Sequence, residues 1–155
     1  MRTVQQIEKT LEYIRRHFFE RGDLSGTLQH YQQVLSECEQ HAVPPDAFAI
    51  CCRDIADVLF ELHKKPEAYA MYDRALSYKL IDLNIRAHTL MNKGISLVRD
   101  GRAHEGVVLL QEALTCAQGK TLREIIKHNL QIYISSRDPS IIPVDTSTLD
   151  QKLQD

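Results

Sequence analysis

Two stretches of the chain carry the same alternation of small and large apolar residues, and this repetition limits the possible folds more than any other feature does. They run from Ala49 to about Asp82 and from Ala87 to about Lys120. The repeated positions are Ala56, Leu59, Ala68, Tyr72, Ala75 and Leu76 in the first and Gly94, Leu97, Gly106, Leu110, Ala113 and Leu114 in the second. Repetition at this spacing is typical of stacked helical hairpins.

The small residues predict where the two helices of each hairpin cross. Helices approach closely only where neither carries a bulky side chain, so we expect Ala56 to face Ala68. By the same argument Gly94 faces Gly106. Large residues one helical turn further on lie on the same apolar stripe and fill the space beside each crossing. Gly101 suits the left-handed conformation that commonly ends a helix, so a turn is predicted there.

Together these segments resemble the tetratricopeptide repeat, over roughly Lys9–Lys120. A weaker copy precedes the two clear ones, with Phe18, Gly22, Asp23, Thr27, Tyr31, Val34 and Leu35 at the pattern positions. Arg15 stands where the family has a small residue, and the family's tryptophan and repeat-ending proline are absent. The spacing is 41 residues from Leu35 to Leu76 and 38 from Leu76 to Leu114, against a family unit of about 34.

The resemblance implies an all-α fold, a right-handed superhelix of helical hairpins. We expect seven helices, at residues 4–20, 24–40, 47–62, 66–79, 85–100, 103–118 and 122–135. The seventh would cap the open face of the last hairpin, as solenoids require. Residues 1–136 are therefore expected to form one repeat domain, and residues 137–155 a tail. The tail is either mobile or docked on the body through Ile141, Ile142 and Val144.

Several helix starts carry residues that can cap them. The predicted caps are two capping boxes, Thr3 with Gln6 and Thr121 with Glu124, and three single residues, Asp23, Asp46 and Asn84. At each position a side-chain oxygen would accept a hydrogen bond from a backbone N–H of the first helical turn.

The charge balance provides no general attraction to nucleic acid or to anionic membranes. The formal net charge is −2 and the pI is about 6.4. No apolar run approaches the roughly 20 residues of a membrane-spanning helix. The first residues, which include Glu8 and Lys9, lack the apolar core of a signal peptide. We therefore expect a soluble cytoplasmic protein.

No cofactor, metal ion or catalytic centre is predicted. The four cysteines fall inside predicted helices and are expected to be reduced, because a chain of this size needs no disulfide framework. One set of residues could be gathered into a zinc site: Cys38, His41, Cys51 and Cys52. Its two adjacent cysteines point about 100° apart on a helix, which fits a tetrahedron badly. The chain has no glycine-rich phosphate loop and no nucleophile elbow, so we expect no enzyme.

Function is therefore expected on a surface. In tetratricopeptide proteins the first helix of each hairpin lines a concave groove, and such a groove suits an extended peptide or a helix of a partner protein. The resemblance implies a groove lined by Lys9, Glu12, Tyr13, Arg16, Arg53, Asp57, His88, Met91, Asn92, Ile95 and Arg99. Met91 and Ile95 would give adaptable apolar contact while the polar groups bond the partner's backbone. The expected function is that of a non-catalytic adaptor or complex subunit.

A narrower alternative is that the groove clamps a terminal carboxylate. Family members with that specificity use basic and asparagine side chains, and a similar set is present in Arg53, Asn92, Arg123 and Lys127. However, Asp57 stands where an asparagine belongs, and it could instead pair with Arg53 four residues away.

Two further classes of function stay open. RNA binding, as in pentatricopeptide proteins, is opposed by the acidic net charge and by the absence of a repeated code residue. Self-assembly is suggested by Tyr13, Ile14, Phe18 and Phe19, which leave the helix at 4–20 with more apolar surface than one buried stripe needs. The tail could cover that surface instead.

Overall fold

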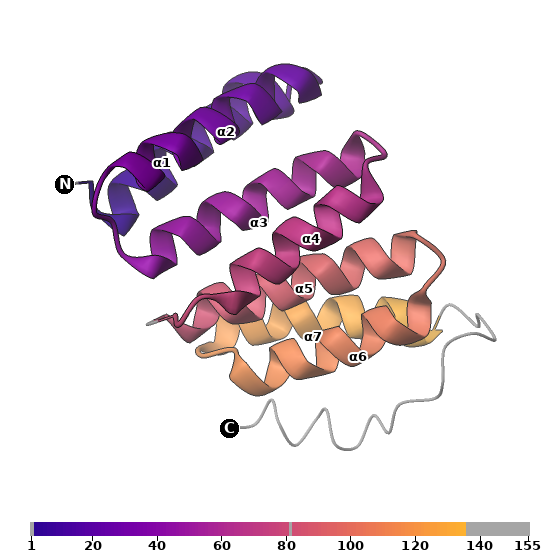
Figure 1. Ribbon diagram of the computed structural model, residues 1–155. Coiled ribbons are helices and arrows are strands. Elements are labelled where there is room, and N and C mark those ends of the chain that lie inside the picture. The colour runs from indigo at the N-terminus through magenta and orange to yellow at the C-terminus, as the bar shows by residue number, and fades with distance from the viewer. Residues whose placement is uncertain (1, 81, 136–155) are drawn as a thin grey trace. The chain divides into compact units, whose positions relative to one another are not determined.

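Every regular element is a helix in the part of the chain that the structure, a computed structural model, describes: residues 2–80 and 82–135 (Figure 1). The elements are α1 (Val4–Ile14), the π-helical turn η1 (Arg15–Phe19), α2 (Leu24–Gln40), α3 (Pro45–Glu61), α4 (Lys65–Ser77), α5 (Leu83–Arg99), α6 (Ala103–Cys116) and α7 (Lys120–Ser135). The predicted all-α fold with seven helices is confirmed. When α1 and η1 are taken as one helix, every bound lies within two residues of its predicted position.

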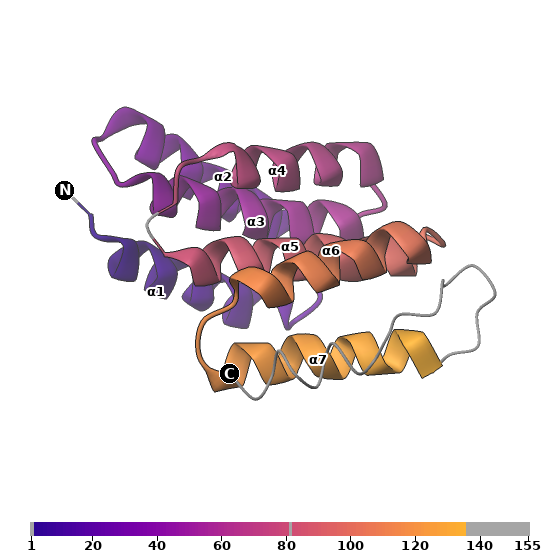
Figure 2. The same ribbon diagram turned by 90° about the horizontal axis from the view of Figure 1, so that it is seen from below.

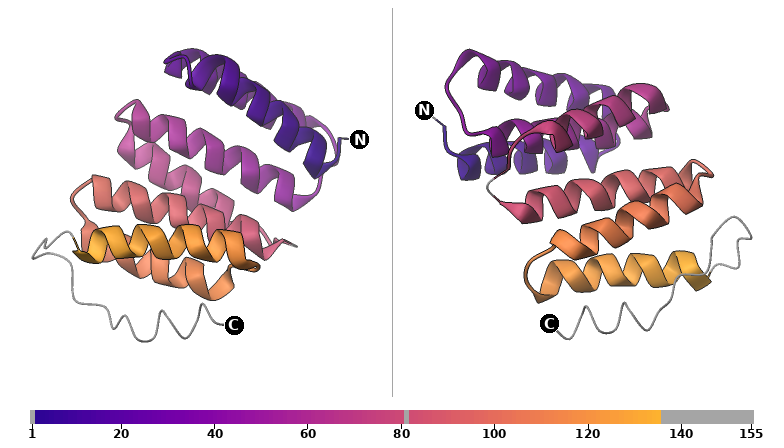
Figure 3. Two further views of the ribbon diagram at one scale, coloured as in Figure 1. Left: turned by 180° about the vertical axis from the view of Figure 1, so that it is seen from behind. Right: turned by 60° about the horizontal axis from the view of Figure 1, so that its bottom comes forward.

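The helices form two compact units, which divide between Asp82 and Leu83. In unit 1, α2 and α4 both pack on α3, and α1 packs on α2 and α3. In unit 2, α6 packs on α5, and α7 contacts both of them. Figure 2 shows α7 alongside the hairpin of α5 and α6, and the right-hand view of Figure 3 follows these three helices in chain order.

A residue in the left-handed conformation lies in the turn of each of the three hairpins. These residues are Gly22 (φ 83°), His63 (φ 62°) and Gly101 (φ 79°). In each turn the next N–H donates to the carbonyl five residues earlier at 2.9 Å, in the pairs Asp23 to Phe18, Lys64 to Leu59 and Arg102 to Leu97. This is the Schellman arrangement, which satisfies carbonyls at a helix end. The weak first copy therefore turns by the same mechanism as the two clear copies.

The predicted glycine crossing in unit 2 is confirmed. A Cβ atom added to Gly94 would lie 2.8 Å from the carbonyl oxygen of Gly106. A Cβ atom added to Gly106 would lie 2.6 Å from Cγ2 of Val98. Because real Cβ atoms do not come this close to other atoms, only glycine permits α5 and α6 to approach as they do. Leu110 fills the adjacent space and is fully buried.

The corresponding residues of unit 1 are alanines. Ala56 on α3 and Ala68 on α4 are both fully buried, and the two helices pack on each other. Tyr72, one turn beyond Ala68, is 1% exposed. The predicted apolar stripe of this hairpin is thus its core.

The first helix differs from the other helices at the position where a small residue was expected. Arg15 begins the π-helical turn η1, and its side chain is half-exposed, with ion pairs to Glu12 and Glu20. A π-turn admits an extra residue per turn, which rotates the following side chains. Half of the Arg15 side chain is exposed, and its ion pairs with Glu12 and Glu20 lie at the surface of the hairpin.

Two of the five predicted caps are confirmed and three are wrong. Thr3 forms the capping box with Gln6, and Asp23 accepts from the backbone N–H of Gly26 at 2.9 Å. Asp46 and Asn84 lie inside the first turns of α3 and α5, because these helices begin at Pro45 and Leu83. Helix α7 begins at Lys120, so Thr121 is inside that helix as well.

Asp46 and Asn84 instead close their hairpins. The Asp46 carboxylate accepts a hydrogen bond from the N–H of Asp82 at 3.1 Å, and Asn84 Oδ1 accepts one from the N–H of Gln118 at 2.7 Å. Each bond joins the start of a hairpin to the backbone that follows its second helix. Each unit therefore has its own closing hydrogen bond at the equivalent position. Sequence spacing alone did not predict these bonds.

The predicted tail at 137–155, with Ile141, Ile142 and Val144, lies outside the described residues. Within them, no helix is both long enough and apolar enough to cross a bilayer.

Candidate functional site

A largely buried ion pair lies on α3 of unit 1. Arg53 Nε donates to Asp54 Oδ1 at 3.2 Å, and only 14% and 19% of the two side chains are exposed. Burial disfavours the guanidinium charge, but Asp54 and Asp57 outweigh this and raise the pKa of Arg53. Burial also raises the pKa of the Asp54 carboxyl, which Arg53 and Arg15 offset only in part.

Two tyrosines border this pair. The Tyr72 hydroxyl of α4 donates a short hydrogen bond to Asp57 Oδ1. Tyr31 of α2 is 3% exposed, and burial raises the pKa of its hydroxyl, with the charges of Asp54 and Asp57 adding to the shift. Three helices thus contribute to one half-buried polar cluster, which we call the α3 cluster: Tyr31, Arg53, Asp54, Asp57 and Tyr72.

Helix α1, which packs on α3, carries four exposed residues of the predicted groove, Lys9, Glu12, Tyr13 and Arg16. Tyr13 is 59% exposed and stacks on His17, with the ring centroids 3.9 Å apart. The Arg16 side chain is 63% exposed and pairs with Glu12 at 2.7 Å. An exposed aromatic ring beside an exposed guanidinium is a combination enriched at protein interfaces. Lys9 is exposed on the same helix.

Unit 2 places the remaining predicted residues unequally. Met91 is 6% exposed, so its side chain lies in the interior and is not presented to a partner. His88, Asn92 and Ile95 are half-buried, and Arg99 is exposed at the end of α5. Burial raises the pKa of the Tyr133 hydroxyl on α7, and Arg99 lowers it in part, which places these two groups near each other.

The predicted anion contacts lie on α7. Arg123 Nε donates to the carbonyl of Ala117 at 3.0 Å, which ties the start of α7 to the preceding loop. Lys127 follows one turn later and is half-buried. Of the carboxylate-binding set, Arg53 belongs to unit 1, whereas Asn92, Arg123 and Lys127 belong to unit 2.

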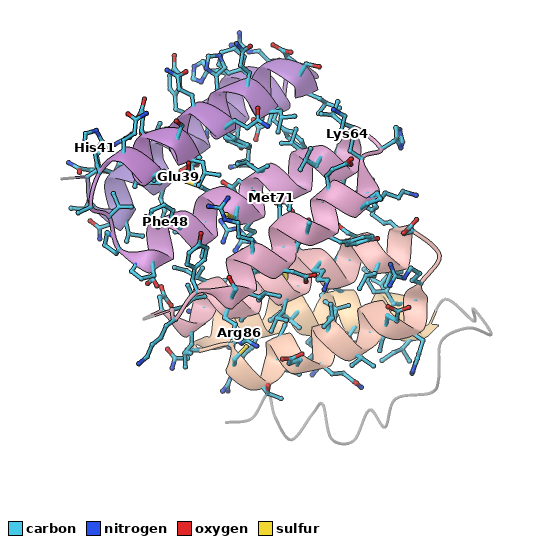
Figure 4. All side chains as sticks on the ribbon, viewed as in Figure 1. Glu39, His41, Phe48, Lys64, Met71 and Arg86 are labelled. Atoms are coloured by element: carbon cyan, nitrogen blue, oxygen red, sulfur yellow. The ribbon has the colours of Figure 1, made fainter. Side chains whose placement is uncertain are left out.

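A second polar group in unit 1 had no sequence signal. Arg74 of α4 pairs with Glu39 at 3.0 Å and donates to the Tyr78 hydroxyl at 3.1 Å, and the Tyr78 ring stacks on Phe48. Glu39 and Phe48 are labelled in Figure 4. Arg74 and Glu39 are 35 residues apart in the sequence. Periodicity within one helix therefore could not identify this ion pair. Their hydrogen bonds raise the pKa of Arg74.

All four cysteines are free thiols. Cys38, Cys51 and Cys52 are buried and Cys116 is half-buried. Burial raises the pKa of the Cys52 thiol to about 11, despite the opposing charge of Arg74. In the part of the chain described, no three histidine, cysteine or acidic side chains converge in a way that could hold a metal ion.

No family model matches the chain, and no curated protein or solved structure matches it significantly. Function is therefore inferred from the side chains of the two units alone.

Proposed function

We propose that this protein is a non-catalytic adaptor or complex subunit that binds a peptide or helix of another protein on the α1 and α3 side of unit 1. The observation that carries the proposal is the exposed Tyr13 and Arg16 of α1, a helix that packs on α3 with its Arg53–Asp54 pair. Tyrosine and arginine are the residues that most often dominate the energy of protein interfaces.

The half-buried α3 cluster supports a binding role. A partly buried ion pair is weak support for stability, since desolvation of two charges offsets most of their attraction. Well-packed apolar residues would stabilise α3 at least as well at the positions of Arg53 and Asp54. A polar group retained there, with acceptors and donors of both signs, suits recognition of a polypeptide backbone or of charged side chains.

The proposal includes a helical repeat of the tetratricopeptide kind. It is supported by the three Schellman turns, by the glycine crossing of α5 and α6, by the buried Ala56 and Ala68 of α3 and α4, and by the equivalent closing hydrogen bonds of Asp46 and Asn84. We also propose a cytoplasmic location, in keeping with four free thiols, which a reducing compartment preserves.

The test compares partners captured by the full-length wild type with those captured by the double variant Tyr13→Ala plus Arg16→Ala. A matched control is Arg102→Ala at the N-cap of α6 plus Val108→Ala within α6, which also removes one arginine and one apolar side chain, each of about 47% exposure. We expect at least one protein to be lost with the α1 variant and retained with the control. Its purified binding segment should bind the variant about 30-fold more weakly than wild type by calorimetry.

A second variant tests the deeper residues. Arg53→Glu reverses one charge on α3. If every captured protein survives both this change and the α1 change, the proposed surface is the wrong one. A salt-dependent shift of single-stranded RNA at low micromolar protein would favour RNA binding in its place.

A further inference from the structure

Two cysteines of unit 1 meet at the interface where α2 packs on α3. Cys38 lies on α2 and is 2% exposed, and Cys51 lies on α3 and is 0% exposed. The buried residues of α2 recur at helical spacing and therefore form one face of that helix: Thr27, Tyr31, Val34, Leu35 and Cys38. Cys38 is the last member of this face, close to the loop that leads into α3.

The two thiols are joined by a hydrogen bond and are chemically unequal. Burial raises the pKa of the Cys38 thiol, and the side-chain hydrogen bond from Cys51 lowers it in part. Burial also raises the pKa of Cys51, and the charge and hydrogen bond of Cys38 raise it further. Cys51 thus acts as the donor of the pair, and Cys38 is the member whose thiolate the contact favours.

The third buried thiol of unit 1 belongs to a different group. Cys52 follows Cys51 directly, and adjacent residues point about 100° apart on a helix. Its side-chain hydrogen bond is made with Tyr78, the residue after α4. Cys51 and Cys52 are equally buried, so Cys52 provides a matched control for Cys51.

Cys38 lies in a helical turn that is favourable to local opening. The last turn of α2 contains Glu37 and Glu39 and no basic residue, and acidic side chains are unfavourable at the negative end of the helix dipole. Ion pairs from Arg2 to Glu37 and from Arg74 to Glu39 hold this turn, but all four side chains are at least 38% exposed. Exposed ion pairs contribute little stability, so the turn opens more readily than the core of the hairpin does.

We propose that Cys38 and Cys51 are a redox-sensitive pair that a small-molecule disulfide, such as oxidised glutathione, converts to an intramolecular disulfide bond. The Cys38 thiolate attacks one sulfur of the small disulfide, which forms a mixed disulfide and releases one small thiol. The Cys51 thiolate then attacks the Cys38 sulfur and releases the second small thiol. Two protein thiols are oxidised by two electrons, the small disulfide is reduced, and the two protons pass to the released thiols.

This bond would tie the last turn of α2 to α3 and enclose the loop at residues 41–44. The inference concerns the interior of the hairpin and does not depend on the partner that we place on α1. A reducing compartment leaves the pair as thiols, and an oxidative challenge closes it.

The test treats folded full-length protein with oxidised and reduced glutathione and maps the product by mass spectrometry without added reductant. Between Arg21 and Arg53 the sequence has no other lysine or arginine, so trypsin leaves both cysteines in one peptide. A second cleavage after Glu39 separates them. We expect the two fragments to stay joined, with the mass of two hydrogen atoms lost, and to separate after reduction.

Variants identify the partners. Each carries Cys116→Ser to remove the half-buried thiol of unit 2. Cys38→Ala and Cys51→Ala should abolish the joined fragments, whereas Cys52→Ala should retain them. Circular dichroism checks that each variant is folded, and the mapping of wild type needs no substitution.

The equilibrium constant for this exchange should be about 100-fold larger in the folded protein than in concentrated urea, because the fold raises the effective concentration of one thiol at the other. Oxidation should also slow native cleavage after Glu39 about tenfold, since cleavage follows the population of the open form.

Three results would overturn the proposal. Joined fragments that persist in Cys51→Ala and disappear in Cys52→Ala assign the bond to Cys52. An equilibrium constant no larger in the folded protein than in urea means that the hairpin does not favour the bond. Glutathione adducts on wild type without joined fragments show that Cys51 does not resolve the mixed disulfide.

Discussion

The hairpin of α3 and α4 in unit 1 and the hairpin of α5 and α6 in unit 2 use the same scaffold with different side chains. Their equivalent residues are 38 positions apart: Ala56 and Gly94 at the crossing, His63 and Gly101 in the turn, Asp46 and Asn84 at the closing contact. The difference lies on the first helix of each hairpin. Arg53 and Asp57 of α3 correspond to Met91 and Ile95 of α5.

This comparison separates two kinds of position. Positions that set the backbone have narrow requirements: a small residue at the helix crossing, a left-handed backbone conformation in the turn and a hydrogen-bond acceptor at the closing contact. The helices could not otherwise cross and turn as they do. Positions on the first helix tolerate a charged cluster in one unit and apolar or half-buried residues in the other. The second kind is where the two units can differ in function, and this is why we place the binding surface on unit 1.

The largest effect is expected at the glycine crossing. Gly106→Ala places a Cβ against the backbone of α5, so it should lower the free energy of unfolding by about 3 kcal/mol. The control in unit 1 is Ala68→Gly, which should cost only about 1 kcal/mol through helix propensity. Urea titration measures both. Equal costs would mean that α5 and α6 do not cross closely at the two glycines.

The thiols of unit 1 should react more slowly than the thiol of unit 2. Cys52 is fully buried and has a pKa of about 11, against an ordinary value of 9.0, so at pH 8 its thiolate population is about 100-fold below that of a free thiol. Cys116 of unit 2 is half-buried and should react first with a disulfide reagent. Stopped-flow labelling gives the rates, and Cys116→Ser should abolish the fastest phase. A fast phase that survives in that variant would contradict the burial of the thiols in unit 1.

The ion pair of unit 1 should be costly to break and cheap to replace. Arg53→Ala leaves Asp54 with less compensation and should lower the free energy of unfolding by about 2 kcal/mol. The double variant Arg53→Met plus Asp54→Leu should restore most of that loss, since it removes both charges. The single variants Arg53→Met and Asp54→Leu complete a double-mutant cycle, in which additive losses would show that the two side chains are independent.

Substitutions in the hairpin turns should change the free energy of unfolding by smaller amounts, with opposite signs in the two units. Gly101→Ala should cost about 1 kcal/mol, because an L residue at φ 79° is strained although its Cβ meets nothing within 4 Å. His63→Gly should stabilise unit 1 by about 0.5 kcal/mol, the relief of strain exceeding the added entropy of the unfolded chain. Thermal unfolding of both variants tests the signs. Two changes of the same sign would contradict the equivalence of the turns.

The smallest effect is a pH dependence at Asp54. Its folded pKa lies above the ordinary 3.8, so the folded state binds this proton more tightly than the unfolded state does. The stability of wild type relative to Asp54→Asn should therefore fall as the pH rises from about 3.8 through the folded pKa. Urea titrations between pH 3 and pH 7 measure the difference. A difference that rises with pH would mean that Arg53 outweighs burial.

Part of the candidate site followed from the sequence and part did not. The exposure of Tyr13 and Arg16 agrees with their expected place on the first helix, which helical periodicity defines. The hydrogen bond from Arg53 to the adjacent Asp54 was not foreseen, because the helical spacing of four residues pointed to Asp57. Asp57 accepts from Tyr72, which belongs to another helix. Rotamers in a half-buried cluster depend on neighbours from α2 and α4, and no periodicity carries that information.

The sequence by itself determined the helices, the turn at Gly101 and the glycine crossing, since each depends on local properties: apolar periodicity, permitted φ values and the absence of a side chain. Only the tertiary structure decided that Asp46 and Asn84 close their hairpins instead of capping helices, and that Met91 is interior. These outcomes depend on which distant backbone or side chain arrives beside a residue. That is fixed by the packing of whole helices on one another, which acts between residues some 35 positions apart in the chain.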